Sequence, residues 1–121
     1  MKNLMIAGLG LVLSLGVAAP AIAADSPGAK SVTGTLEDSF CYGTMGAKGS
    51  SHKQCAIGCA KKGVPVSLVE KGTDKIYILL PAKDGMALPN DVIDKMEDEV
   101  TISGKEYSKG GVDFLVVESV K

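Results

Sequence analysis

The sequence has no tryptophan, few other aromatic residues, a single histidine and no excess of positive charge. Three tyrosines and two phenylalanines offer little for bases or sugar rings to stack on. With 13 basic against 14 acidic residues, the net charge is −1 at pH 7. A nucleic-acid-binding domain needs a basic surface to neutralise phosphates. The composition therefore argues against nucleic-acid binding and against electrostatic binding to a membrane surface.

The sequence also lacks the residue combinations of common catalytic sites. It contains no Ser/His/Asp constellation, no glycine-rich phosphate loop and no pair of catalytic carboxylates that we recognise. One acidic cluster is most simply interpreted as the solvated face and end of a helix. Its members are Asp91, Asp94, Glu97, Asp98 and Glu99. We therefore expect a protein that is not an enzyme.

Residues 1–23 have the pattern of a secretion signal. Lys2 supplies a positive charge, an apolar run covers residues 4–19, and an Ala-x-Ala cleavage motif ends at Ala23. The apolar run is shorter than the ~20 residues of a membrane-spanning helix, and no cysteine follows the cut to carry a lipid. We expect a mature chain that begins at Ala24, is periplasmic or secreted, and is not attached to a membrane.

The remaining chain is long enough for one small domain. We expect a flexible leader over residues 24–30, because it contains Ser, Pro and Gly, and a single domain over residues 31–121. Alternating or continuous apolar patterns predict five strands. They cover residues 32–36 (continuing toward Tyr42), 64–68, 76–80, 100–103 and 112–120. The third strand is continuously apolar, so we expect it to be buried on both faces.

Two helices are predicted between these strands. A glycine-rich loop over residues 43–51 leads into the first helix, where Ser51 and Gln54 have the spacing of a capping box. That helix ends at Gly63, in position for a left-handed cap. The second helix covers roughly residues 91–97. Its apolar stripe consists of Val92, Ile93 and Met96.

This order of elements is that of an OB-fold. We predict a mainly β protein with two helices: a five-stranded OB-fold-like barrel, with the cysteine-bearing helix inserted between strands one and two and the second helix between strands three and four. In element order and expected compartment, residues 32–121 resemble small exported bacterial OB-fold proteins, a group that includes periplasmic copper chaperones. Those chaperones use methionines, a histidine and a tryptophan on their strands. This chain departs from that pattern, so no ligand is transferred by position.

All three cysteines and the only histidine lie within residues 41–59, together with a methionine. In an oxidising compartment thiols tend to pair, and an odd number leaves one free, bridged to a partner or bound to metal. Spacings of three and four residues put His52, Cys55 and Cys59 on one face of the predicted helix. Cys41 lies at the end of the preceding strand. These soft ligands indicate a metal or redox site.

Metal geometry leaves two arrangements open, since ligand atoms of one ion lie within ~4–5 Å of one another. The first uses the thiolates of Cys41, Cys55 and Cys59 and suits Zn²⁺ or Cu(I). His52 is its fourth ligand if the first helical turn unwinds, because His52 and Cys59 are otherwise roughly 10 Å apart. The second suits Cu(I), because a thioether is a soft ligand. Its members are Cys41, Met45, His52 and Cys55.

Three other interpretations of the cysteines stay open. Cys55, in the first helical turn, could attack a disulfide, although C-x₃-C is not the C-x-x-C of thioredoxin-like proteins. Cys41 could form a structural disulfide with Cys55 or Cys59, or the cysteines could simply pack in the core. We favour a periplasmic domain that binds Cu(I) first and zinc second, with another periplasmic protein as a further partner. The three sulfurs should then converge within roughly 5 Å, with His52 at the same rim.

Overall fold

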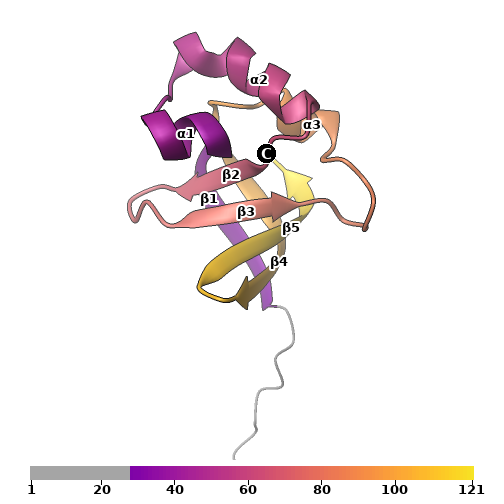
Figure 1. Cartoon of the computed structure of the whole chain (residues 1–121). Helices are drawn as coiled ribbons and strands as arrows, with labels where there is room; N and C mark the ends of the chain where they lie inside the picture. The colour runs from indigo at the N-terminus through magenta and orange to yellow at the C-terminus, as the bar shows by residue number, and fades with distance from the viewer. Residues whose placement is uncertain (1–27) are drawn as a thin grey trace, which may run out of the picture.

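The computed structural model describes residues 28–121, and its centre is a closed five-stranded barrel (Figure 1). The strands are β1 (Gly28–Asp38), β2 (Val66–Glu70), β3 (Ile76–Leu80), β4 (Glu99–Lys109) and β5 (Val112–Val120). They are hydrogen-bonded in the order β1-β2-β3-β5-β4, and β1 also pairs with β4 to close the barrel. Only β3 and β5 run parallel. The predicted mainly β, OB-fold-like barrel is thus confirmed.

The helices lie in two of the connections. Between β1 and β2 the chain forms α1 (Ser39–Met45), the 3₁₀ turn η1 (Ser50–His52) and α2 (Lys53–Lys61). A single-turn helix, α3 (Asn90–Ile93), lies between β3 and β4. The part of the chain that the structure describes therefore has three α-helices where two were predicted. In Figure 1 all three gather at one end of the barrel, and the β4–β5 turn lies at the other.

The N-terminal predictions are only partly covered by the structure. The expected secretion signal over residues 1–23, and residues 24–27 of the expected leader, lie outside the described residues. Residues 28–30 were assigned to a flexible leader, but they form the start of β1 and pair with β4. The strand is favoured here because β4 is long enough to supply backbone partners as far as Glu106.

Apolar side chains from every strand fill the barrel, and the helices close one end of it. Burying this apolar surface is the main force that holds the domain together. From the helical end, Ala56 of α2 and the expected stripe of Val92, Ile93 and Met96 are buried. The strand residues that are almost fully buried are Val32, Leu36, Leu68, Tyr77, Ile102 and Leu115.

The predictions for the segment after β1 were wrong in two respects. The strand was expected to continue toward Tyr42, but it ends at Asp38, whose carboxylate accepts hydrogen bonds from the backbone N–H groups of Phe40 (2.9 Å) and Cys41 (3.3 Å). Aspartate is a strong helix N-cap, so a helix replaces the expected end of the strand and the first three residues of the loop. The predicted capping box is also absent, because Ser51 lies inside η1 and no side chain caps α2.

The prediction that β3 is buried on both faces was wrong as well. Tyr77 and Leu79 point into the barrel, whereas Ile76 and Leu80 are 44% and 36% exposed. In a barrel with no outer layer, only the inner face of each strand is covered. A continuously apolar strand therefore alternates between buried and exposed side chains. The second helix is also shorter than residues 91–97, since turns follow α3 from Asp94.

Two glycines allow neighbouring strands to approach closely. A Cβ on Gly104 would overlap the carbonyl oxygen of Val116, and one on Gly34 would overlap that of Val69. Gly104 also lies where the β4–β5 register shifts. Glycine at such a bulge or bend is a structural requirement.

We therefore predict that Gly104→Ala lowers the free energy of unfolding by about 2 kcal/mol or more, because the strands must separate to accept the methyl group. Urea unfolding followed by circular dichroism measures the change. Gly58→Ala is the control, since Gly58 lies on α2 with nothing within 4 Å of an added Cβ. That variant should gain roughly 0.5–1 kcal/mol. Equal stability of the two variants would contradict the argument.

Candidate metal centre

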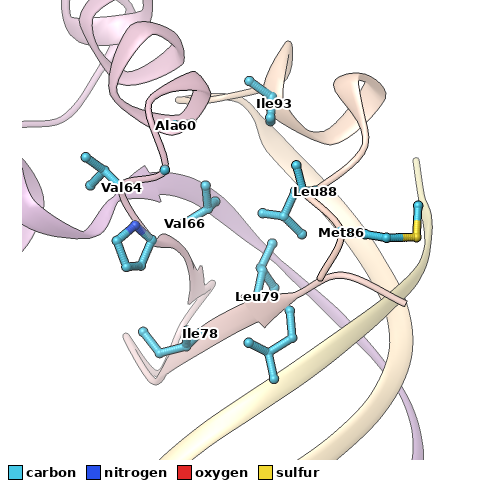
Figure 2. A pocket seen from close by; sticks show the side chains of 12 residues that line it. Ala60, Val64, Val66, Ile78, Leu79, Met86, Leu88 and Ile93 are labelled. Carbon is cyan, nitrogen blue, oxygen red and sulfur yellow. The ribbon is translucent and has the colours of Figure 1, made fainter. Parts of the chain in front are cut away.

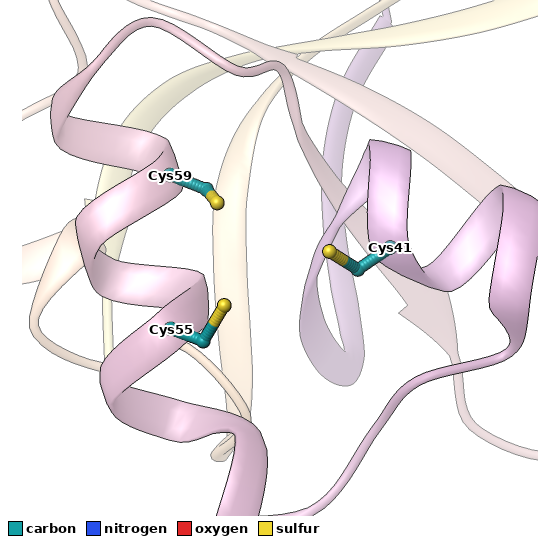
Figure 3. A group of neighbouring side chains, drawn as sticks. All are labelled: Cys41, Cys55 and Cys59. Atoms are coloured by element: carbon teal, nitrogen blue, oxygen red, sulfur yellow. The ribbon is translucent and has the colours of Figure 1, made fainter.

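Three cysteine side chains meet between α1 and α2. Cys41 lies on α1, and Cys55 and Cys59 lie one turn apart on α2. Figure 3 shows the sulfurs of the two α2 cysteines directed toward α1, and that of Cys41 directed toward α2. The three Sγ atoms lie within 4.8 Å of one another, and all three residues are free thiols. This agrees with the separation of roughly 5 Å that was expected for ligands of one ion.

The position of Cys41 follows from the way α1 is attached to the barrel. The backbone N–H of Ser39 donates to the carbonyl oxygen of Pro65 (3.0 Å), and its hydroxyl is 2.7 Å from that of Ser67 at the start of β2. At the other end, Gly46 adopts a left-handed conformation and turns the chain toward η1. The helix is thus fixed at both ends, with Cys41 buried.

The second helix packs on the barrel with the side next to its cysteines. Ala56 is fully buried in the core, and the neighbouring Cys55 and Cys59 are directed toward α1. Cys55 is exposed and Cys59 is half-buried, whereas Cys41 is buried. The sulfur group is therefore open to solvent on its Cys55 side.

The Asp38 carboxylate controls the protonation of two of these thiols. Burial raises the pKa of Asp38, but the Cys41 and Cys59 thiols and two backbone N–H groups outweigh it, so the net pKa is lowered. In return, Asp38 is the largest cause that raises the pKa of Cys41 to about 11 and the pKa of Cys59 above its ordinary value. Both thiols hold their protons at neutral pH, so a bound metal must displace them.

His52 lies beside Asp38 and Cys41. A ring nitrogen of His52, a carboxylate oxygen of Asp38 and the Cys41 sulfur all lie within 4.8 Å of one another. The prediction had placed His52 in the same α-helix as Cys55 and Cys59, but α2 begins only at Lys53. His52 therefore does not share the regular helical spacing of Cys55 and Cys59. It lies instead near Asp38, the N-cap residue of α1.

Met45, the remaining predicted ligand, lies at the end of α1 with 67% of its surface exposed. A thioether in that position is surrounded mainly by solvent. The arrangement that used Met45 as a copper ligand is therefore less favoured than the three-thiolate arrangement.

Three acidic residues of this region were missed as members of the site. They are Glu37, Asp38 and Glu97, all with buried side chains. Glu97 was assigned to a solvated helix end, but its side chain is 0% exposed, and that interpretation was wrong. Its backbone N–H donates to Leu36 (2.7 Å), and its Oε2 accepts from Gly49 (2.7 Å), which draws it beneath the helices. The only available signal was that Asp38 comes three residues before Cys41.

Glu37 and Glu97 are neighbouring carboxyl groups, and the charge of Glu97 affects the pKa of Glu37. Burial, and next the neighbouring Glu97 carboxylate, raise the pKa of Glu37 to about 7. Two carboxylates that share a buried site resist ionising together. This end of the barrel thus holds an unusual amount of buried acidic charge close to the thiols.

A separate apolar groove lies where the end of α2 meets β3 and the segment before α3 (Figure 2). It has a volume of about 320 Å³, and no titratable side chain lines it. The residues labelled in Figure 2 include Val64, Val66, Leu79, Met86, Leu88 and Ile93. The groove offers apolar contacts and no thiol, imidazole or carboxylate group. The cluster of thiols and carboxylates is therefore the candidate functional site.

Comparison with protein-family models, with curated proteins and with solved structures found no match to this chain. The resemblance to exported OB-fold proteins stays a prediction. Within residues 28–121, none of the helices has the length and apolar character required to cross a bilayer.

We predict that Asp38→Asn lowers the pKa of Cys41 from about 11 toward 9.0, because the amide can still cap α1 but carries no charge. Cys41 should then be alkylated faster at pH 8, as measured by mass spectrometry of the peptide that contains it. Asp94→Asn, at an exposed position, is the control and should leave the rate unchanged. An unaltered pH profile in Asp38→Asn would show that the carboxylate does not govern this thiol.

Proposed function

We propose that the protein is an exported, non-enzymatic domain that binds a soft metal ion, Cu(I) first and zinc second, through Cys41, Cys55 and Cys59. The observation that supports this is the convergence of three sulfur atoms within 4.8 Å on two separately anchored helices. Metal–thiolate bonds of about 2.3 Å allow one ion to contact ligand atoms at such separations.

The ligand set favours Cu(I) over zinc. Thiolate ligands select Cu(I) and Zn²⁺ among common metals, but structural zinc is almost always held by four protein ligands. The converging group offers three sulfurs, and the only histidine lies with Asp38 and Cys41 rather than with all three. A three-coordinate, all-sulfur site is suited to Cu(I).

Thiol–disulfide exchange is a weaker explanation of the same group. The attacking thiol expected from the sequence is Cys55, and its two possible partners are Cys41 and Cys59. The carboxylate of Asp38 raises the pKa of Cys41 to about 11 and also raises the pKa of Cys59, which makes both of them poor leaving groups in the exchange. A structural disulfide between Cys41 and an α2 cysteine is the second candidate. The close approach of the sulfurs supports it, although it leaves one thiol unused.

The exposed Cys55 suggests how the metal is exchanged. A ligand at the solvent side of the site can be replaced by a thiol or imidazole of another protein while the buried Cys41 still holds the ion. We therefore propose a second periplasmic protein as the partner in metal transfer.

For this site we predict one Cu(I) per reduced protein molecule and sulfur-only coordination, measured by elemental analysis and X-ray absorption. Cys55→Ser combined with Cys59→Ser should abolish Cu(I) binding, because one thiolate remains. The β-rich circular dichroism spectrum should persist, since the barrel strands lie outside the insert.

Met45→Leu should retain Cu(I) binding, and the matched control is Met86→Leu at another exposed methionine. Loss of Cu(I) in Met45→Leu alone would restore the thioether arrangement. A protein isolated without metal, with one free thiol and two thiols joined in a disulfide, would favour the structural candidate instead.

Export is tested separately. We predict that the mature protein begins at Ala24, because the Ala-x-Ala motif ends at Ala23. Intact-mass measurement of the protein from a periplasmic fraction gives the answer. A mass that retains residues 1–23 would overturn the proposed location without affecting the metal site.

A further inference from the structure

Four buried polar atoms at the helical end of the barrel have no hydrogen-bond partner within the described chain. They are Glu37 Oε2, Asp38 Oδ2, His52 Nε2 and Glu97 Oε1. A buried polar group without a partner costs free energy, and a buried charge costs more. Glu37 and Glu97 face each other and can share a proton, so Asp38 Oδ2 and His52 Nε2 are the two atoms that most require a further polar or charged partner.

His52 is the residue that the others have in common. His52 Nε2 is 3.9 Å from Glu97 Oε1, and a nitrogen of the same ring lies within 4.8 Å of both Asp38 and the Cys41 sulfur. Asp38, Cys41 and His52 thus have the separations of ligand atoms around one ion, and Glu97 contacts that group through His52. Asp38 is 1% exposed and the Glu97 side chain 0%, so these carboxylates are withdrawn from solvent.

Separate contacts hold Asp38 and Glu97 in place. Asp38 is fixed as the cap of α1 through its Oδ1, and its carboxylate also faces the Cys41 and Cys59 thiols, whose protons a bound metal would displace. Glu97 is held by its Oε2, which accepts from the Gly49 N–H, and by its backbone, which pairs with Leu36. In Asp38 one oxygen therefore positions the group and the other is available to a metal. That division is what a preformed cation site requires.

We propose that Asp38 and His52 form a second metal site, which takes a divalent cation of intermediate softness such as Zn²⁺, shares the Cys41 thiolate with the three-sulfur site and uses Glu97 to position the His52 ring. Zinc binds thiolate, imidazole and carboxylate ligands, usually four in a tetrahedral arrangement. Mg²⁺ and Ca²⁺ prefer oxygen alone. The two sites would divide the cluster by chemistry, with sulfur ligands on one side of Cys41 and nitrogen and oxygen ligands on the other.

The charges of the region suit a divalent cation. The Asp38 carboxylate and the Cys41 thiolate would contact it, the Glu97 carboxylate would lie against His52, and the cation would supply the missing partner of Asp38 Oδ2. Glu37 lies against Glu97, but no measured ligand distance joins it to His52, so we assign it no bond to the metal. The proposal depends on the proposed function only through the sharing of Cys41.

The decisive experiment first removes two of the three cysteines of the three-sulfur site. In the full chain carrying Cys55→Ser and Cys59→Ser, Cu(I) binding is lost, but one Zn²⁺ should still bind in a calorimetric titration. Adding His52→Gln should weaken that binding by about 100-fold or more, and adding Glu97→Gln should weaken it by about 10–100-fold, as expected for the outer partner of a metal ligand. Glu99→Gln, at an exposed carboxylate paired with Lys71, is the matched control and should bind normally.

The shared ligand has its own readout. Cys41 is the only cysteine left in the double variant, so Co²⁺ used in place of Zn²⁺ should show a sulfur-to-metal charge-transfer band that Cys41→Ser removes. Absence of the band would overturn the sharing of the thiolate. Absence of Zn²⁺ binding in the double variant, or equal binding by His52→Gln and Glu99→Gln, would overturn the site. Equal binding by Glu97→Gln and Glu99→Gln would overturn the positioning role of Glu97.

Folding is checked by circular dichroism for each variant, and His52→Gln decides the question if Glu97→Gln does not fold. Failure of the proposed function gives a different pattern. In that case the unaltered protein does not bind Cu(I), yet it binds one Zn²⁺ that depends on Glu97. Loss of Cu(I) binding by Glu97→Gln in the otherwise unaltered protein would show a single mixed site and overturn the division into two.

Discussion

The arrangement of the site depends on one side chain, the carboxylate of Asp38. Its Oδ1 accepts the first backbone N–H groups of α1, which ends β1 and starts the helix that carries Cys41. The same carboxylate lies beside the Cys41 and Cys59 thiols and raises their pKa values. Asp38 thus acts as the cap that joins the barrel to the helical insert. It also keeps the Cys41 and Cys59 thiols protonated.

The helical end of the barrel gathers buried charge that the rest of the domain avoids. Glu37 and Asp38 end β1, and Glu97 arrives from the turn before β4, where its backbone pairs with Leu36. Closing a barrel brings these segments together regardless of their separation in sequence. Because burial disfavours ionised groups, this cluster costs free energy in the folded state, and the proposed cation would offset that cost.

Local patterns predicted the barrel well because strand alternation and turn residues are encoded over a few neighbouring positions. Residues 112–120 were predicted as a strand and form β5 with the same bounds. Prediction failed in two places for different reasons. The segment after Asp38 became α1 because of a local cap that the strand pattern did not take into account. Residues 76–80 alternate between buried and exposed because a barrel wall has only one inner face.

By itself, the sequence determined which soft ligands exist and that they lie within residues 41–59, since composition and spacing are local properties. The succession of patterns also indicated the order of the strands along the chain. Only the tertiary structure decided that three sulfurs converge and that His52 turns toward Asp38 and Cys41. The burial of Glu97 was likewise invisible in the sequence. An acidic residue in a polar stretch looks solvated until a backbone contact from a distant strand, here Leu36, draws it beneath two helices.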